Sequence, residues 1–103
     1  VILQSAKSDY RRIKTYVMQK CGAETWLEIN HEWKVKLNKL ATNPELGNNI
    51  FELDGTGLTG FKRYQYKNAY VVYQTSDALL TVYMFIPSMR DFRRHLMDRL
   101  LAA

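Results

Sequence analysis

The spacing of the apolar residues changes once along this chain of 103 residues, and the change predicts the fold class. Over residues 5–41 apolar side chains recur every three or four positions, as on one face of a helix. Between residues 60 and 85 they form three short runs rich in Tyr, Val, Phe and Thr, the composition of strands. We therefore expect an α+β fold, with a helical part packed on a sheet.

The helical part is predicted to be a hairpin of two helices. The apolar stripe of the first helix, residues 5–20, contains Ala6, Tyr10, Ile13 and Val17. The stripe of the second helix, residues 23–41, contains Trp26, Ile29, Trp33, Leu37 and Leu40. Gly22 lies between them as a helix stop, and Ser5 is a suitable N-cap for the first helix. The apolar run "VILQ" before Ser5 is expected to form a short N-terminal strand.

The sheet is predicted to be a three-stranded antiparallel meander. Residues 42–60 contain Pro44 and four glycines, and we expect them to be mainly loop. The runs "GFKRYQY", "AYVVYQT" and "LLTVYMF" follow, and the short connections "KN" and "SDA" predict hairpins between them. In the first run, alternation separates Phe61, Arg63 and Gln65 from Lys62, Tyr64 and Tyr66.

Pro87 is expected to end the last strand, and a C-terminal helix is predicted within "RDFRRHLMDRLL". The apolar side of this helix contains Phe92, Leu96 and Leu100, with arginines beside it. If the helix docks on the sheet, its arginines form an exposed cationic rim. If it does not dock, the apolar side is available to a partner. The whole chain, residues 1–103, is expected to be a single domain.

Composition narrows the possible partners and the compartment. The lone Cys21 cannot form an internal disulfide, and no segment has the roughly 20 apolar residues that span a bilayer. A cytoplasmic protein without membrane contact is therefore expected. The net charge is +5, and residues 62–103 hold seven Lys and Arg against three Asp and Glu. A surface for an acidic partner is predicted in this last part of the chain.

Three interpretations of the basic residues remain open at this point. No metal or other cofactor is expected, because Cys21, His31 and His95 lack the spacing of zinc ligands. Metal-independent RNA cleavage needs cations and proton-transfer groups, and the available ones are Lys62, Arg63, Arg90, Arg93, Arg94 and His95, with several tyrosines nearby. The same residues could instead bind a protein, or simply face water.

The order of these features resembles the ParE branch of the RelE/ParE toxin superfamily of bacterial toxin-antitoxin systems. The resemblance rests first on "SAKSDYRRIKTYV", in which Ala6, Asp9, Ile13 and Tyr16 have the spacing of the family. It continues in "LNKLATNPELG", in "YVVYQ" and in the ending "RDFRRHL", and so covers nearly the whole chain.

The resemblance implies a toxin that a cognate antitoxin neutralises in a hetero-oligomer. RelE-like members cleave mRNA on the ribosome, whereas ParE-like members poison DNA gyrase. Compared with the RelE-type active site, Lys62 is present and Arg90 can stand for a later arginine. However, Val71 follows Tyr70 where that site has an arginine, and the last helix lacks a tyrosine. The ParE activity, without catalytic residues, is therefore expected.

This interpretation assigns roles to two sets of residues. Gyrase is expected to contact Arg90, Arg93, Arg94 and Arg99. The antitoxin is expected to contact Leu27, Val35, Phe92, Leu96 and Leu100. The alternative is a ribosome-dependent mRNA interferase that uses Lys62, Arg63, Arg90 and His95. A third possibility is a basic α+β binding domain that is not toxic.

Overall fold

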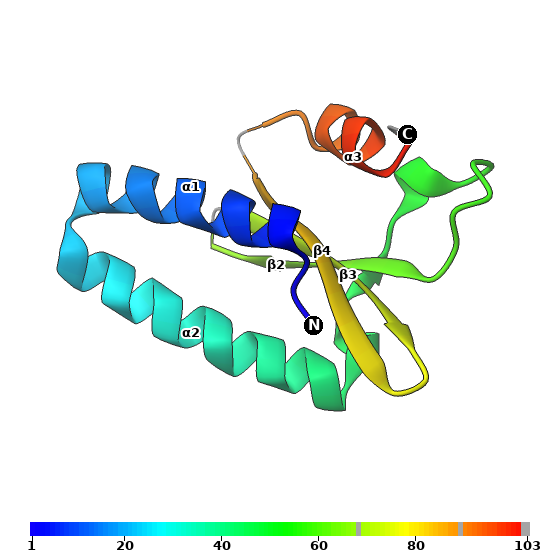
Figure 1. The fold of residues 1–103 in the computed structure, drawn as a ribbon, viewed down its shortest axis with the longest axis horizontal. Helices are drawn as coiled ribbons and strands as arrows, with labels where there is room; N and C mark the ends of the chain where they lie inside the picture. Colours follow the sequence, from blue (N-terminus) through cyan, green and yellow to red (C-terminus); the bar gives the residue numbers. More distant parts are fainter. Residues whose placement is uncertain (68, 89, 102–103) are drawn as a thin grey trace.

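The computed structural model describes residues 1–67, 69–88 and 90–101, and has the α+β architecture expected from the sequence (Figure 1). The helical elements are α1 (Gln4–Cys21), α2 (Ala23–Thr42), α3 (Phe92–Leu100) and the 3-10 turns η1 (Pro44–Leu46) and η2 (Phe51–Leu53). The strands are β1 (Asn48–Asn49), β2 (Phe61–Tyr66), β3 (Ala69–Ser76) and β4 (Leu79–Pro87). Figure 1 shows α1 and α2 as two long arms joined by one tight turn.

The strands form one antiparallel sheet in the order β1-β2-β3-β4. Tyr66 pairs with Ala69 and Ser76 pairs with Leu79, so two-residue connections join the strands as hairpins. The prediction of a three-stranded sheet was incomplete, because β1 adds a two-residue strand beside β2 and makes the sheet four-stranded. The first connection consists of Lys67 and Asn68, of which Asn68 lies outside the described residues.

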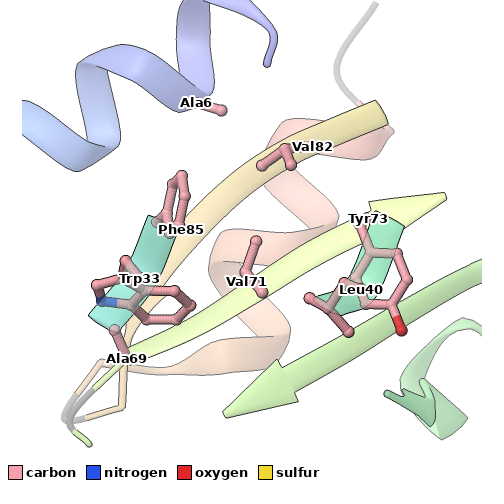
Figure 2. Close-up of a cluster of buried hydrophobic side chains, with 8 residues drawn as sticks. All are labelled: Ala6, Trp33, Leu40, Ala69, Val71, Tyr73, Val82 and Phe85. Atoms are coloured by element: carbon pink, nitrogen blue, oxygen red, sulfur yellow. The ribbon is translucent and has the colours of Figure 1, made fainter. Parts of the chain in front are cut away.

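The helical hairpin covers one face of the sheet and encloses the first hydrophobic core (Figure 2). The predicted stripe of α2 is largely confirmed, because Trp26, Trp33 and Leu40 are buried. The ring of Trp33 packs edge-on against Phe85 of β4, with 5.4 Å between ring centroids. Alternation along the strands brings Val71 and Tyr73 of β3 into the same cluster.

The opposite face of the sheet packs against α3 and the segment before β2. This second core contains Ile50, Leu53, Val72, Met84, Ile86 and Leu96. Met84 would share the face of Val82 in a regular strand, but the register between β3 and β4 shifts at Tyr83. The irregularity thereby lets β4 supply Val82 and Phe85 to the hairpin side and Met84 to the α3 side.

The start of the chain differs from the prediction. The expected strand "VILQ" is reduced to one parallel bridge between Ile2 and Val82. The helix begins at Gln4 rather than after Ser5, and no side chain caps it. The N–H of Leu3 donates to the carbonyl of Val82, so the chain turns into α1 directly after contacting the sheet edge.

The segment 42–60 also contains more structure than expected. Tyr73 is 1% exposed, and its hydroxyl donates to the carbonyl of Pro44 at 2.6 Å and accepts from the N–H of Gly47 at 3.0 Å. A Cβ at position 47 would lie 2.2 Å from this hydroxyl oxygen, so only glycine fits. Tyr73 thereby holds η1 and the glycine after it against β3.

The backbone conformation of the turn between β3 and β4 can be tested by a glycine substitution. Asp77 and Ala78 both have positive φ, 51° and 63°, as in the two-residue turns that favour glycine at the second position. We expect Ala78→Gly to raise the free energy of unfolding by about 0.5–1 kcal/mol, because glycine adopts this conformation without steric cost. Chemical denaturation measures the change. Thr75→Gly, in the adjacent strand, should lower stability, and a loss of stability in Ala78→Gly would contradict the turn geometry.

Candidate partner-binding surface

Helix α3 begins where the sequence provides a side-chain cap. Asp91 is its N-cap, and one carboxylate oxygen accepts from the backbone N–H of Arg94 at 3.2 Å. Pro87 is the last residue of β4, as predicted, and its carbonyl accepts from the N–H of Arg90. The helix is therefore fixed at its start, close to the end of the last strand.

The apolar side of α3 is docked on the sheet. Leu96 has no exposed surface, and Phe92 and Leu100 are partly buried against the second core. Of the two arrangements considered for this helix, the docked one is therefore observed. Leu96 cannot touch an antitoxin while α3 keeps this position, so the expected contacts on Phe92, Leu96 and Leu100 do not correspond to an open surface here.

Docking leaves three of the four predicted target-binding arginines exposed. Arg90 lies in the turn before α3, and Arg93 and Arg94 lie on its outer side. The side chain of Arg94 is 80% exposed, and it pairs with Asp98 at 4.0 Å. Such an exposed pair contributes little to stability, so this guanidinium is available to a partner. We call Arg90, Arg93 and Arg94 the α3 arginine rim.

Arg99, the fourth predicted target-binding residue, has a structural role instead. Its guanidinium donates two hydrogen bonds, of 2.8 and 3.1 Å, to the two carboxylate oxygens of Asp9 in α1. The side chain of Asp9 is only 5% exposed, whereas that of Arg99 is 34% exposed. A bidentate ion pair of this kind combines opposite charges with a fixed geometry, and here it joins α3 to α1.

Asp9 also accepts a hydrogen bond from a backbone N–H at the outer edge of β4. The backbone N–H of Phe85 points away from β3 and donates to Oδ2 of Asp9 at 3.2 Å. Arg12, one turn further along α1, donates to Oδ1 of Asp9. One buried carboxylate thus connects α1, β4 and α3, and we call this set of contacts the Asp9 clamp.

Arg63 is held between aromatic rings under α3. Its guanidinium carbon lies 4.7 Å from the ring centroid of Phe92 and 5.2 Å from that of Tyr70. It also pairs with the largely buried Glu52 at 3.5 Å. The Glu52 carboxylate and the faces of two aromatic rings thus balance the positive charge of Arg63, which favours a role of this side chain in packing.

The four residues of the nuclease alternative are not brought together. Lys62 and Arg63 are neighbours in a strand and so project to opposite faces of the sheet. The ammonium of Lys62 contacts Asn49 at 2.9 Å and Glu45 at 3.5 Å, whereas Arg63 lies under α3. Arg90 and His95 are both exposed. General acid-base catalysis needs these groups to converge on one atom, and this geometry separates at least two of them.

Leu27 and Val35, the two predicted antitoxin-binding residues of α2, differ in exposure. Leu27 is 64% exposed, and Val35 is half-buried. Leu27 is thus an accessible apolar side chain on the outer side of the hairpin.

Within residues 1–67, 69–88 and 90–101, no helix is both long enough and apolar enough to cross a membrane. The same residues contain no group of three or more His, Cys, Asp or Glu side chains arranged to hold a metal ion.

Two tyrosines in the core have altered acidity. Burial raises the pKa of Tyr10 to about 12. Burial also raises the pKa of Tyr73, and the nearby Glu45 carboxylate acts in the same direction. Both phenols therefore remain neutral at physiological pH, as hydrogen-bond donors within the fold.

Sequence reasoning missed two features of this region. Asp9 was identified only as a position in a family pattern, although a lone acidic residue close to the apolar stripe of a basic helix is a signal for a buried ion pair. The charge of α1 was missed as well, because in the charge of residues 1–61 as a whole it is offset by the acidic residues that follow this helix. Helix α1 alone holds five Lys and Arg against Asp9, a net charge of +4.

Comparison with known proteins does not add a family assignment. No protein-family description matches the sequence, and no curated protein is significantly similar to it.

The Asp9 clamp can be tested with a double-mutant cycle. We expect Asp9→Ala to lower the free energy of unfolding by about 3 kcal/mol, because it leaves Arg99 and the N–H of Phe85 without an acceptor. Arg99→Ala should cost less, since Arg12 still pairs with Asp9. The coupling energy between the two sites should exceed about 1 kcal/mol. Arg94→Ala is the matched control and should change stability by less than about 0.5 kcal/mol. Additive effects of the Asp9 and Arg99 substitutions would contradict the clamp.

Tyr10 predicts how stability depends on alkaline pH. Its hydroxyl donates to Asn30 at 2.8 Å, and its pKa of about 12 lies above the usual value of 10. The unfolded chain therefore loses this proton first, so stability is complete below about pH 10 and falls as the pH rises toward 12. Tyr10→Phe should lower stability at neutral pH by about 1 kcal/mol and make the alkaline decline shallower. Tyr16→Phe, at an exposed tyrosine, should leave the decline unchanged. Equal slopes for Tyr10→Phe and the wild type would refute the assignment.

Proposed function

We propose that this protein is a ParE-like toxin of a type II toxin-antitoxin system, which arrests growth by inhibiting DNA gyrase through protein-protein contact. The observation that carries the proposal is the α3 arginine rim, Arg90, Arg93 and Arg94, exposed on and just before a helix whose apolar side is docked on the sheet. Arginines presented by a fixed element are typical anchors of protein interfaces.

The arrangement of the elements supports the same proposal. A parallel bridge joins the start of the chain to β4, a long helical hairpin covers one sheet face, and a terminal helix follows the meander. This is the order from which the resemblance to the RelE/ParE superfamily was drawn. The hairpin arms are long, α1 (Gln4–Cys21) and α2 (Ala23–Thr42), and in this they resemble the ParE branch more than the ribosome-dependent nucleases.

Contact, rather than chemistry, is favoured by the positions of the charged groups. A metal-independent nuclease would need Lys62 and Arg63 to act on one phosphate, and these residues lie on opposite sheet faces. Arg63 is further occupied by Glu52 and two aromatic rings. Among residues 1–67, 69–88 and 90–101, the only ion pair of the α3 arginine rim is the long, exposed one between Arg94 and Asp98.

Neutralisation by an antitoxin completes the proposal. The exposed Leu27 on α2 offers an apolar contact on the hairpin, and the half-buried Val35 extends it. A toxin of this kind acts in the cytoplasm and forms a hetero-oligomer with its antitoxin.

The α3 arginine rim can be tested by reversing one charge. Arg94→Glu should abolish growth arrest on expression in a bacterial host and reduce inhibition of gyrase supercoiling at least tenfold, because interface arginines of this kind are worth more than about 1.4 kcal/mol. Stability should be nearly unchanged, since the side chain is 80% exposed.

Lys34→Glu, at an exposed position of α2, makes the same change of charge away from the rim and should retain the inhibition. A ribosome-dependent mRNA cleavage assay on the same preparation distinguishes the alternative. Full toxicity of Arg94→Glu would overturn the placement on α3, and cleaved mRNA with unaffected gyrase would overturn the proposed activity.

A further inference from the structure

Helix α2 has one side that the rest of the fold does not cover. Its buried side packs on α1 and the sheet, and Figure 1 shows no other element of the described chain beyond its opposite side. Residues recur on this opposite side every three or four positions, as on one face of a helix. We call it the outer face of α2. It consists of Glu24, Leu27, Glu28, His31, Lys34, Val35, Asn38 and Lys39, all exposed except the half-buried Val35.

The charges of α2 are divided between its two halves. Residues 23–33 contain three glutamates and no lysine or arginine, whereas residues 34–42 contain three lysines and no aspartate or glutamate. Glu32 and Lys36 pair with each other within the helix at 3.7 Å. The other four charged residues belong to the outer face: Glu24, Glu28, Lys34 and Lys39. The outer face is therefore acidic in its first half and basic in its second half.

An apolar side chain lies in each half of the same face. Leu27 is 64% exposed between the two glutamates, and Val35 follows Lys34. The helix dipole favours acidic residues near the start of a helix and basic residues near its end, so it accounts for the order of the charges. It does not account for the exposed Leu27. An apolar centre with charged residues around it is the usual composition of a protein interface.

The outer face of α2 is complementary to itself when two copies run antiparallel. Leu27 lies four positions before His31, and Val35 lies four positions after it. Glu28 and Lys34 lie three positions on either side of the same histidine. An antiparallel copy centred on His31 therefore brings each Glu28 to the level of a Lys34, and each Leu27 to the level of a Val35. A parallel copy would instead bring like charges together.

We propose that the outer face of α2 binds the same face of a second copy of this chain, with the two helices antiparallel. Leu27 of each copy packs near Val35 of the other, and the glutamates of each copy attract the lysines of the other. A helix of 20 residues is about 30 Å long, which is enough for both halves of the face to take part. This inference goes beyond the proposed function and does not depend on it.

A second copy fits the outer face better than a partner of one charge. The two exposed glutamates and two exposed lysines give the face no net charge. The phosphates of a nucleic acid would meet Glu24 and Glu28 in the first half, and a purely acidic peptide would meet the same carboxylates. The same face of another copy offers opposite charge to both halves at once.

The test is sedimentation equilibrium of the full chain at physiological ionic strength. We expect the wild type to form a dimer at micromolar concentration, with twice the 12.1 kDa mass of one chain. Glu28→Lys and Lys34→Glu should each weaken dimerisation by at least about tenfold, because the two-fold axis turns each substitution into two contacts between like charges. Circular dichroism checks that the variants fold, which their exposed positions favour.

A charge exchange within one chain makes the test specific. The double variant Glu28→Lys/Lys34→Glu keeps the net charge of the wild type and restores opposite charges across the axis. Its dimerisation should return to within roughly threefold of the wild type. An equimolar mixture of the two single variants should likewise form a heterodimer. Arg11→Glu, at an exposed position of α1, is the matched control for Lys34→Glu and should dimerise as the wild type does.

Three results would overturn the inference. The first is a wild type that remains monomeric at about 100 µM, which would leave the outer face to a different partner. The second is dimerisation of the single variants equal to that of the wild type. The third is a folded double variant that dimerises no better than the single ones.

Gyrase inhibition separates this inference from the proposed function. Lys34→Glu should be monomeric and still inhibit supercoiling as the wild type does, because the α3 arginine rim is unchanged. A wild type that dimerises through the outer face without inhibiting gyrase would overturn the proposed function alone. A monomeric wild type that inhibits gyrase would overturn the dimer alone. Since Leu27 and Val35 are also the antitoxin contacts proposed above, an antitoxin bound there would separate the two copies.

Discussion

The buried carboxylate of Asp9 is the interaction on which the arrangement of this protein depends. Moving a carboxylate from water into a protein interior costs several kcal/mol unless other groups replace its hydration. Here Arg99 supplies two hydrogen bonds, Arg12 supplies another, and the N–H of Phe85 supplies a fourth. Each donor comes from a different part of the chain, so satisfying this one group fixes α1, β4 and α3 relative to one another.

The clamp also resolves a difficulty at the edge of the sheet. Strand β4 is an outer strand, and its outward N–H and C=O groups would otherwise be open to pairing with another chain. The backbone around Leu3 and Val1 occupies the groups of Val82, and Asp9 occupies the N–H of Phe85. Backbone groups at the start of the chain and the side chain of Asp9 thus satisfy these outward groups of β4. Arg99 docks α3 through the same carboxylate. Arg99 is therefore held within the fold, whereas the arginines of the α3 arginine rim face solvent.

Much of the fold follows from local patterns, because periodicity is a property of consecutive residues. The stripe with Trp26 and Trp33 predicted α2, the composition of 69–75 predicted β3, and Gly22 predicted the turn between the helices. The pieces that were missed depend on distant partners. Ile50 and Leu53 are buried in a segment without any period, and their place in the core is visible only once Met84 and Leu96 lie opposite them.

The candidate site shows the same limit. A helical wheel correctly separates the apolar side of α3 from its arginines, yet it cannot show that Arg99 meets Asp9, which lies 90 positions earlier in the chain. It also cannot show whether the helix docks, since an exposed apolar stripe and a buried one have the same spacing. Dividing the chain at residue 61 placed the positive charge in the second part, whereas the helix with a net charge of +4 lies at the beginning, averaged with an acidic stretch.

The distribution of charge finally bears on the kind of function that this fold can perform. Inside the fold, each cation has an assigned anion or aromatic partner: Arg99 has Asp9, and Arg63 has Glu52 with Tyr70 and Phe92. Exposed cations lie on the outer sides of α1 and α3, the two helices that the clamp holds together, and also on α2, at Lys34 and Lys39. The clamp joins both helices to one strand, so it places these surfaces in a defined arrangement. A partner that meets both would find them already placed, and little conformational entropy would be lost on binding.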